Sequence, residues 1–385
     1  MQELYIDSPA ALIEFCEQIR GSEWLALDTE FVREKTYYPQ FCLLQISNGQ
    51  LAACIDPIAL EDLGPLVEII YDPSIVKVFH AGRQDLEIFH QIWGSLPSPV
   101  FDTQLAATLL GLGDQVGYGN LVQTLLKHEL DKGLTRTDWS RRPLEKAQLR
   151  YALDDVIYLG EIYHKLRQQL IDQGRESWLA EDFSGLTDPA TYNVDPDTLW
   201  QRIKGRQHLR GVQLAVLQRL TAWRETEAQT HNRPKRWILK DEVLVDLARR
   251  QPADLQKMQQ IRGLEPGAVK RWGELILELI RESKQLPKEQ WPREKRIPQK
   301  LNANQDALTD LLMAALRLQA DHHNITPSAL CTRKELERLI SGDRDLEILH
   351  GWRRALAGKG LLEVLEGRQR PAVVNGVLAL QPATE

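Results

Sequence analysis

Several carboxylates in the first half of the chain are spaced so that they could hold a divalent cation. Asp28 and Glu30 stand at i and i+2 at the end of the apolar run WLALDTEF, which predicts a strand that carries both side chains on one face. Two carboxylates held close together repel each other unless a cation lies between them, and hard ions such as Mg²⁺ prefer oxygen ligands. An isolated pair of this kind is equally compatible with a solvated strand end.

Two further positions could complete such a site. Asp85 follows the predicted strand IVKVFH and a short loop, where ligand sites of open α/β sheets gather. Its alternative role is that of an acidic residue in the first turn of a helix, favoured by the helix dipole. Tyr151 and Asp155 stand at i and i+4 in YALDDVIYL and therefore share one helix face, whereas Asp154 points elsewhere.

The segments around these residues predict a mixed sheet flanked by helices. The expected strands are 24–31, 41–47, 51–56, 75–80 and 99–102. Asn48 and Gly49 predict a hairpin between the second and third of them. The expected helices are 58–70, 83–93, 103–112 and a long one from about 145 to 169. This order is compatible with an α/β core of the ribonuclease H-like kind.

From about residue 186 the sequence changes to a turn-rich linker, followed by segments that we expect to be helical only. The predicted helices are 211–228, 241–249, 254–258 and 265–282, then 305–321 after a second, proline-containing linker at 284–300. The helix 305–321 resembles 211–228 at an offset of about 95 residues. We interpret the two sets as a duplicated small helical domain.

Charge is divided unevenly along a chain whose net charge is −6. Residues 1–200 carry a net −16, residues 201–300 a net +11 and residues 301–385 a net −1. An acidic region can hold divalent cations and a basic one can hold phosphates, although either can also be a plain solvated surface. The four cysteines lack C-x-x-C spacing, and neither a secretory signal nor a membrane-spanning run is present, so we expect a cytoplasmic protein.

The order of the motifs is more specific than any one of them. A strand-borne D-x-E, then HAGRQD, then Y-x-x-x-D on a late helix resembles the DEDD exonuclease superfamily, in its subgroup with tyrosine in the third motif. VFDTQLAATLLG and LDKGLTRTDWSRRPL narrow the resemblance to ribonuclease D, although Gly133, Leu134 and Thr135 are less polar than that family leads us to expect. The two helical sets resemble helicase-and-ribonuclease-D C-terminal (HRDC) domains.

The resemblance implies a fold, a reaction and a site. The fold is an α/β ribonuclease H-like exonuclease domain at 1–190, followed by two small all-α domains at 206–285 and 302–371. The reaction is 3′→5′ hydrolysis of RNA that releases nucleoside 5′-monophosphates, with maturation of tRNA 3′ ends as the expected role. Asp28, Glu30 and Asp155 would hold one of two divalent ions, Mg²⁺ or Mn²⁺, and Asp28 and Asp85 the other. Tyr151 would orient or deprotonate the attacking water.

Contacts with RNA are expected from basic residues and from aromatic rings.

 Phe31 could stack on terminal bases or simply pack in the core. The other expected RNA-binding residues are Arg206, Arg233, Lys235 and Arg236. Trp237 beside them could stack on a base, as could Tyr37 and Tyr38, but for all three we expect packing roles.

Two alternative functions fit the same motifs. The first is a 3′→5′ DNA exonuclease, which the acidic motifs do not exclude, although the tandem helical sets favour RNA. The second is a catalytically inactive RNA-binding adaptor, which the five intact chemistry positions disfavour. For the protein itself we expect a monomer whose partner is RNA, in particular tRNA precursors, and no membrane.

Overall fold

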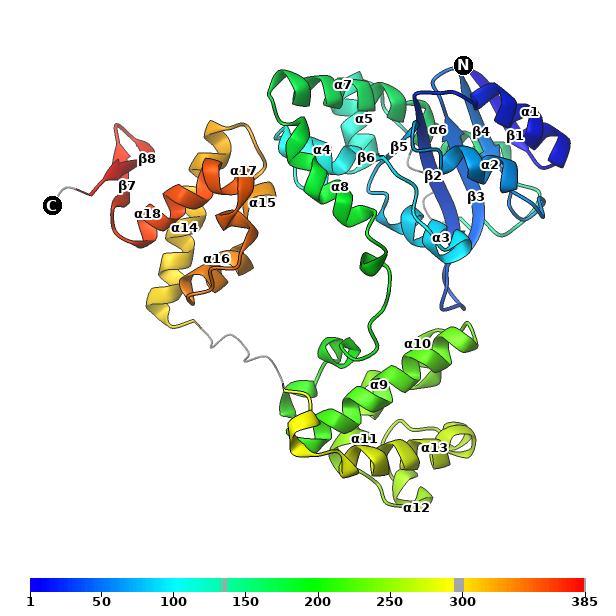
Figure 1. The fold of residues 1–385 in the computed structure, drawn as a ribbon, viewed down its shortest axis with the longest axis vertical. Coiled ribbons are helices and arrows are strands. Elements are labelled where there is room, and N and C mark those ends of the chain that lie inside the picture. Colours follow the sequence, from blue (N-terminus) through cyan, green and yellow to red (C-terminus); the bar gives the residue numbers. More distant parts are fainter. Residues whose placement is uncertain (132, 134–136, 294–300, 384–385) are drawn as a thin grey trace. The chain divides into compact units, whose positions relative to one another are not determined.

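A computed structural model describes residues 1–131, 133, 137–293 and 301–383 (Figure 1). Two of the three positions that depart from the family pattern, Leu134 and Thr135, therefore lie outside the described residues. Residues 294–300 of the second linker lie outside them as well. The chain forms two compact units. Unit 1 comprises 1–30, 41–191 and 298–385, and unit 2 comprises 31–40 and 192–297. No helix among the described residues is long and apolar enough to cross a membrane.

A six-stranded mixed sheet lies at the centre of the first region of the chain. Its strands are β1 (Gln2–Ile6), β2 (Trp24–Val32), β3 (Gln40–Ser47), β4 (Leu51–Ile55), β5 (Val76–Phe79) and β6 (Val100–Asp102), in the order β1-β4-β3-β2-β5-β6. The predicted hairpin is confirmed, because β3 and β4 pair antiparallel with Ser47 opposite Ala52. β2, β5 and β6 run parallel, so their carboxyl ends meet at one edge of the sheet.

Helices surround this sheet in unit 1 (Figure 1). They are α1 (Pro9–Ile19), α2 (Gly64–Ile70), α3 (Arg83–Trp93), α4 (Thr103–Leu109), α5 (Tyr118–Leu126), α6 (Lys146–Ile157), α7 (Leu159–Asp172) and α8 (Ala180–Leu186). Apolar residues of α4 to α7 pack in one core with Ala26 of β2 and Val78 of β5. That core fixes α6 over the face of β2 to which Ala26 points.

The structure corrects three sequence predictions in this region. The elements β1, α1, α5 and α8 were not expected at all. The helix expected at 58–70 begins only at Gly64, because the backbone at Ile58 to Leu60 folds into a turn on Asp56 and Pro65 belongs in a first helical turn. The long helix expected from 145 to 169 is two helices that meet at Tyr158, whose ring stacks on His128 with centroids 4.6 Å apart.

The first helical set lies in unit 2. It consists of α9 (Val212–Thr230), α10 (Lys235–Ile238), α11 (Asp241–Arg250), α12 (Leu255–Met258) and α13 (Pro266–Gln285). Its apolar core also takes in Tyr37 from the segment 31–40, which follows β2. The side chain of Tyr37 is buried, and Tyr38 packs against the same core, so the packing roles expected for both are confirmed.

The second helical set repeats the order of the first and belongs to unit 1. It consists of α14 (Ala303–His322), α15 (Pro327–Leu330), α16 (Arg333–Ile340), α17 (Gly351–Arg353), a π-helical turn at Arg354–Gly358 and α18 (Lys359–Leu365). The expectation of helices only is wrong here, because β7 (Gln369–Val374) and β8 (Val377–Pro382) form an antiparallel hairpin. Asn375 and Gly376, both at positive φ, form its turn.

This second set packs directly against the exonuclease region within unit 1. The indole rings of Trp178 and Trp352 stack with centroids 4.7 Å apart and planes 5° from parallel. The guanidinium of Arg175 donates to the carbonyl oxygens of Leu109 (2.8 Å) and His323 (2.5 Å). The second set is therefore held by ring stacking and by a part-buried hydrogen bond from Arg175 to the carbonyl oxygen of His323.

Candidate active site

Three carboxylates from β2 and α6 meet on one face of the sheet. Asp28 and Glu30 lie on the same face of β2 as Ala26, which is the face that α6 covers. Asp155 projects from α6, and one ligand oxygen from each of Asp28, Glu30 and Asp155 lies within 4.8 Å of the other two. All three side chains are half-buried, so the group can bind a cation and still admit a ligand from solvent.

Asp85 adjoins this group from the start of α3. Its buried carboxylate accepts a hydrogen bond of 2.5 Å from the hydroxyl of Thr29, the residue between Asp28 and Glu30. Thr29 thus ties the first turn of α3 to the end of β2. The sequence analysis did not consider Thr29, and its place inside D-x-E is the only signal that could have drawn attention to it.

A second residue that the sequence analysis missed, Asp102, fixes the loop before Asp85. Its buried carboxylate accepts hydrogen bonds from the backbone N–H groups of Ala81 (3.2 Å) and Gly82 (2.9 Å). It also caps α4 by accepting from Gln104 and Leu105. Ala81 is at φ 56°, and a Cβ on Gly82 would come 2.4 Å from Cβ of Phe79, so this tight loop requires the small residues of HAGRQ.

The tyrosine of the third motif lies on the same helix face as Asp155, as predicted. The half-buried ring of Tyr151 lies 6.2 Å, centroid to centroid, from the buried ring of Trp139. The loop of Trp139 is fastened by Arg142, which pairs with Asp56 through contacts of 2.5 and 2.7 Å. Asp154 points elsewhere and pairs with Arg150, which confirms that it is not part of the acidic group.

The electrostatics of the site are those of acids without a counter-charge. Burial raises the pKa of Asp28 well above its usual value, and the charges of Asp85, Asp155 and Glu30 raise it further. Burial and carboxylates nearby raise the pKa of Glu30 to about 8 and that of Asp155 to about 7. Burial also raises the pKa of Asp85 to about 6, against the lowering effect of the Thr29 hydrogen bond.

Within the described residues, none of these four carboxylates forms an ion pair with a Lys, Arg or His side chain. The donor set therefore fits hard divalent cations, which would supply the missing positive charge. His80, in contrast, is not a ligand here. Its ring nitrogens contact Thr103 Oγ1 (2.9 Å) and the carbonyl oxygen of Val116 (3.0 Å), as expected of a hydrogen-bonded core histidine.

The expected RNA-binding residues are dispersed, and the structure gives them different surroundings. Phe31 is half-buried in the segment 31–40. The half-buried Arg206 donates to the carbonyl oxygen of Ile203 at 3.3 Å, and Lys235 pairs with Glu225 at 2.8 Å. Arg233 and Arg236 are exposed. The core role expected for Trp237 is wrong, because 57% of its surface is exposed.

Comparison with known proteins identifies the family. The family model described as 3′-5′ exonuclease matches residues 4–171, and the HRDC domain model matches residues 213–280. The chain is 41% identical to ribonuclease D of Granulibacter bethesdensis over 92% of this chain and 91% of that one. It is 39% identical to ribonuclease D of Sphingobium indicum over 97% of both. The chain belongs to the ribonuclease D family.

Solved structures agree with this membership. The crystal structure of Escherichia coli RNase D, described as an exoribonuclease involved in structured RNA processing, superposes with a TM-score of 0.83 at 31% identity. The match covers 95% of this chain and 99% of that one. As a ribonuclease D, the protein is a 3′→5′ exoribonuclease, and exonucleases of this kind generally use divalent metals. The fold class expected from the sequence is confirmed, apart from the added hairpin β7–β8.

Proposed function

We propose that the protein removes nucleotides from RNA 3′ ends in a reaction that uses two divalent cations, Mg²⁺ or Mn²⁺. The observation that carries this proposal is the group of Asp28, Glu30 and Asp155, whose ligand oxygens lie within 4.8 Å of one another. Asp85 adjoins the group through Thr29, and neither Asp85 nor the other three acids has a basic partner among the described residues. When bound, such ions activate the attacking water and stabilise the leaving 3′-oxygen.

Each residue of the chain has a separate part in this proposal. Asp28, at the centre of the mutual repulsion, would ligate both cations, with Glu30 and Asp155 on one side and Asp85 on the other. The hydroxyl of Tyr151 would accept a hydrogen bond from the attacking water or donate one to it, and would so orient the water. The ring of Trp139 lies against the ring of Tyr151 and helps to hold it in place. Hydrolysis would break the bond between phosphorus and the leaving 3′-oxygen. The phosphate would then stay on the 5′-oxygen, so that nucleoside 5′-monophosphates are released.

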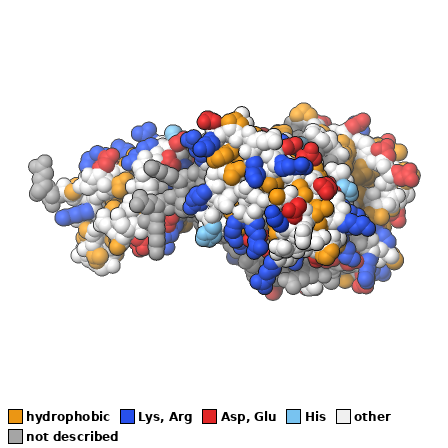
Figure 2. Space-filling model, turned by 90° about the horizontal axis from the view of Figure 1, so that it is seen from below, with side chains coloured by type: hydrophobic (Ala, Val, Ile, Leu, Met, Phe, Trp, Pro, Cys, Tyr) orange, Lys and Arg blue, Asp and Glu red, His pale blue; other side chains and the backbone are white. Residues whose placement is uncertain are grey.

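We further propose that the physiological substrate is a structured RNA with a single-stranded 3′ end, in particular a tRNA precursor. Three domains would contribute to binding and cleavage of this RNA, namely residues 1–190, 206–285 and 302–371. Support for this division comes from the charge of the first helical set, since residues 201–300 carry a net +11. Figure 2 shows many Lys and Arg side chains, interspersed with Asp and Glu, on the side that it views. A basic surface can hold the body of the RNA while an acidic site receives its 3′ end.

The test is digestion of a labelled tRNA precursor with a 3′ extension, beside linear RNA and DNA oligomers of the same sequence. We expect stepwise shortening of the RNA from its 3′ end, release of 5′-monophosphates and loss of activity in EDTA. Faster digestion of DNA would favour the alternative DNA exonuclease. Binding without any metal-dependent cleavage would identify the protein as an RNA-binding adaptor.

A further inference from the structure

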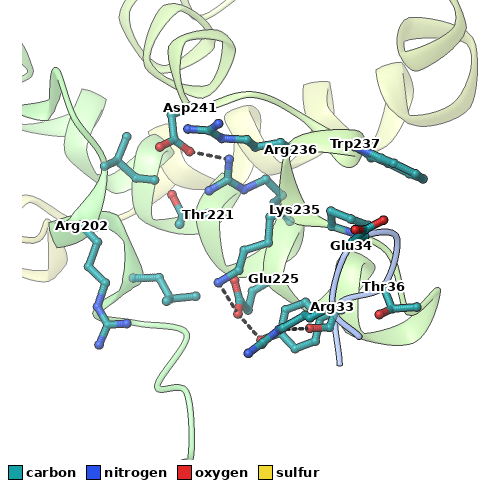
Figure 3. Close-up of a pocket in the computed structure, with 15 residues that line it drawn as sticks. Arg33, Glu34, Thr36, Arg202, Thr221, Glu225, Lys235, Arg236, Trp237 and Asp241 are labelled. Atoms are coloured by element: carbon teal, nitrogen blue, oxygen red, sulfur yellow. Dashed lines mark hydrogen bonds and ion pairs between the residues drawn. The ribbon is translucent and has the colours of Figure 1, made fainter. Parts of the chain in front are cut away.

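A cavity of about 520 Å³ with charged residues in its lining lies within unit 2, where the segment 31–40 meets the first helical set (Figure 3). This volume is in the range of sites that enclose a small ligand. Five of the lining residues are cationic and three are acidic, which leaves an excess of two positive charges. The cavity is separate from the acidic group of Asp28, Glu30 and Asp155, all of which belong to unit 1.

The wall formed by the segment 31–40 is held firmly in place. Asn232 Oδ1 accepts hydrogen bonds from the backbone N–H groups of Tyr37 (3.1 Å) and Tyr38 (3.0 Å). The hydroxyl of Tyr37 donates to the buried carboxylate of Glu225 and accepts from Gln229 at 3.1 Å. These hydrogen bonds fix one wall of the cavity through contacts within the protein.

The charges of the cavity are divided between paired and unpaired groups. Arg224 pairs with Asp241 at 2.7 Å, and Lys235 pairs with Glu225 at 2.8 Å, so the inner charges neutralise each other (Figure 3). Arg202 and Arg236 line the same cavity and are exposed. Neither has a hydrogen-bond or ion-pair partner within the described part of the chain. These two guanidinium groups are therefore available to an anion.

An aromatic surface accompanies these two cations. Trp237 also lines the cavity, and 57% of its surface is exposed, although tryptophan is usually well buried. An exposed indole ring offers a flat apolar face on which a nucleic-acid base can stack. Guanidinium groups bind phosphate oxygens, so the cavity combines the two kinds of group that a nucleotide needs.

We propose that this cavity binds a short stretch of the RNA strand, with separate phosphates on Arg202 and Arg236 and a base on Trp237. The assignment to RNA rests on the proposed function. It is supported by the chain itself, because Arg33 of the cavity wall follows Glu30 by three residues, and three residues span at most about 11 Å. Only two residues of the chain, Phe31 and Val32, therefore separate Glu30 from a residue of the cavity wall.

The experiment measures binding of an oligoadenylate of about 12 nucleotides to full-length protein that carries Asp28→Asn. Added substitutions are Trp237→Ala, Trp237→Phe, Arg202→Gln and Arg236→Gln, with Arg262→Gln as the matched control. Arg262 is an exposed cation of the same unit that does not line the cavity. We expect Trp237→Ala to weaken binding about five-fold or more and Trp237→Phe to restore most of it.

Salt dependence tests the two arginines separately. Each of Arg202→Gln and Arg236→Gln should lower the slope of log affinity against log salt by about 0.7, whereas Arg262→Gln should leave it unchanged. Competition with AMP distinguishes binding of an RNA strand from binding of a free mononucleotide. If AMP does not compete with the oligoadenylate, the result supports an RNA strand as the ligand. If AMP competes and Trp237→Ala removes that competition, the ligand is a free mononucleotide and the proposal as stated is overturned.

Wild-type affinity and salt slope in all cavity variants would also overturn it. This failure can be told apart from failure of the proposed function, because hydrolysis is measured on protein with Asp28 intact. Metal-dependent degradation of RNA together with normal binding by the cavity variants would reject the cavity alone. Loss of binding in those variants without any hydrolysis by the native protein would reject the function alone.

Discussion

The acidic group at the end of β2 and the cavity whose wall begins three residues later differ in which charge is left without a partner. Around Asp28 the carboxylates lie together without a basic partner among the described residues, and their pKa values rise. In the cavity, Glu225 and Asp241 each pair with a cation, and the surplus is positive. The first arrangement requires positive charge from outside the chain, whereas the second requires negative charge.

Replacing Asp28 with Asn tests the first half of this comparison and should have the largest effect. The substitution removes the charge that the other three acids surround, so we expect hydrolysis to fall at least about a hundred-fold, or about 2.7 kcal/mol of activation free energy. RNA binding should persist. Rates are measured by release of mononucleotides, and affinity by a binding titration in EDTA. A variant that keeps more than about a tenth of the rate would contradict the metal assignment.

Replacing Tyr151 with Phe should have the next largest effect. The change removes one hydroxyl and leaves the ring against Trp139, so we expect the rate to fall about ten-fold or more with unchanged products. Asp154→Asn is the control, because Asp154 pairs with Arg150 away from the acidic group. Equal losses in the two variants would mean that the helix-face argument assigns the wrong carboxylate.

The basic side of the comparison is tested by the salt dependence of RNA binding. We expect the pair Arg233→Gln and Arg236→Gln in the first helical set to lower the slope of log affinity against log salt by about 1.4, for two phosphate contacts. The matched pair is Lys334→Gln and Lys359→Gln, two exposed cations of the second set. That set packs on the exonuclease region, so its pair should change the slope little. Equal changes would remove the distinction between the sets.

The smallest expected effect is on stability. The folded-state pKa of the active-site carboxylates lies above their unfolded-state pKa, which is near 4. Their contribution to the free energy of unfolding is therefore fully present below about pH 4 and is lost as pH rises through the folded-state pKa values. For Asp85, Asp155 and Glu30 these are about 6, 7 and 8. The melting temperature in EDTA should therefore fall by a few degrees from about pH 5 to pH 8.

Two comparisons isolate this contribution from the rest of the protein. Mn²⁺ should raise the melting temperature most at the upper end of this pH range, since it supplies the charge that the group lacks. Asp155→Asn should flatten the pH dependence in EDTA, because one of the mutually repelling acids is gone. A pH profile that neither Mn²⁺ nor this substitution alters would show that the four acids do not repel one another in the folded protein.

The residues of the acidic group could be predicted from the sequence because strand and helix periods fix which side chains share a face. Asp28 and Glu30 lie two residues apart on a strand, and Tyr151 and Asp155 four apart on a helix, and the structure confirms both placements. Asp85 could be placed from its position after a buried strand. Thr29 and Asp102 were missed because their hydrogen bonds depend on contacts between segments distant in sequence.

The fold was predictable where the pattern of apolar residues was strong and incomplete elsewhere. Strand β1 is mostly exposed, and only Ile6 in it is buried, so its alternation is weak. The turn Asn375–Gly376 did carry a hairpin signal, but the flanking strands are short and neither contains a fully buried residue. The cavity could not be foreseen, since it depends on Tyr37 packing into a core formed by residues more than 150 positions later.

The carboxylate of Asp102 joins two segments that the chain order separates. It accepts from the amides of Ala81 and Gly82 ahead of α3 and from those of Gln104 and Leu105 in the first turn of α4. A movement of the Asp102 side chain would break the hydrogen bonds of both segments at once. In native-state hydrogen exchange, the amides of Gly82 and Gln104 should therefore open as one cooperative unit with a common free energy.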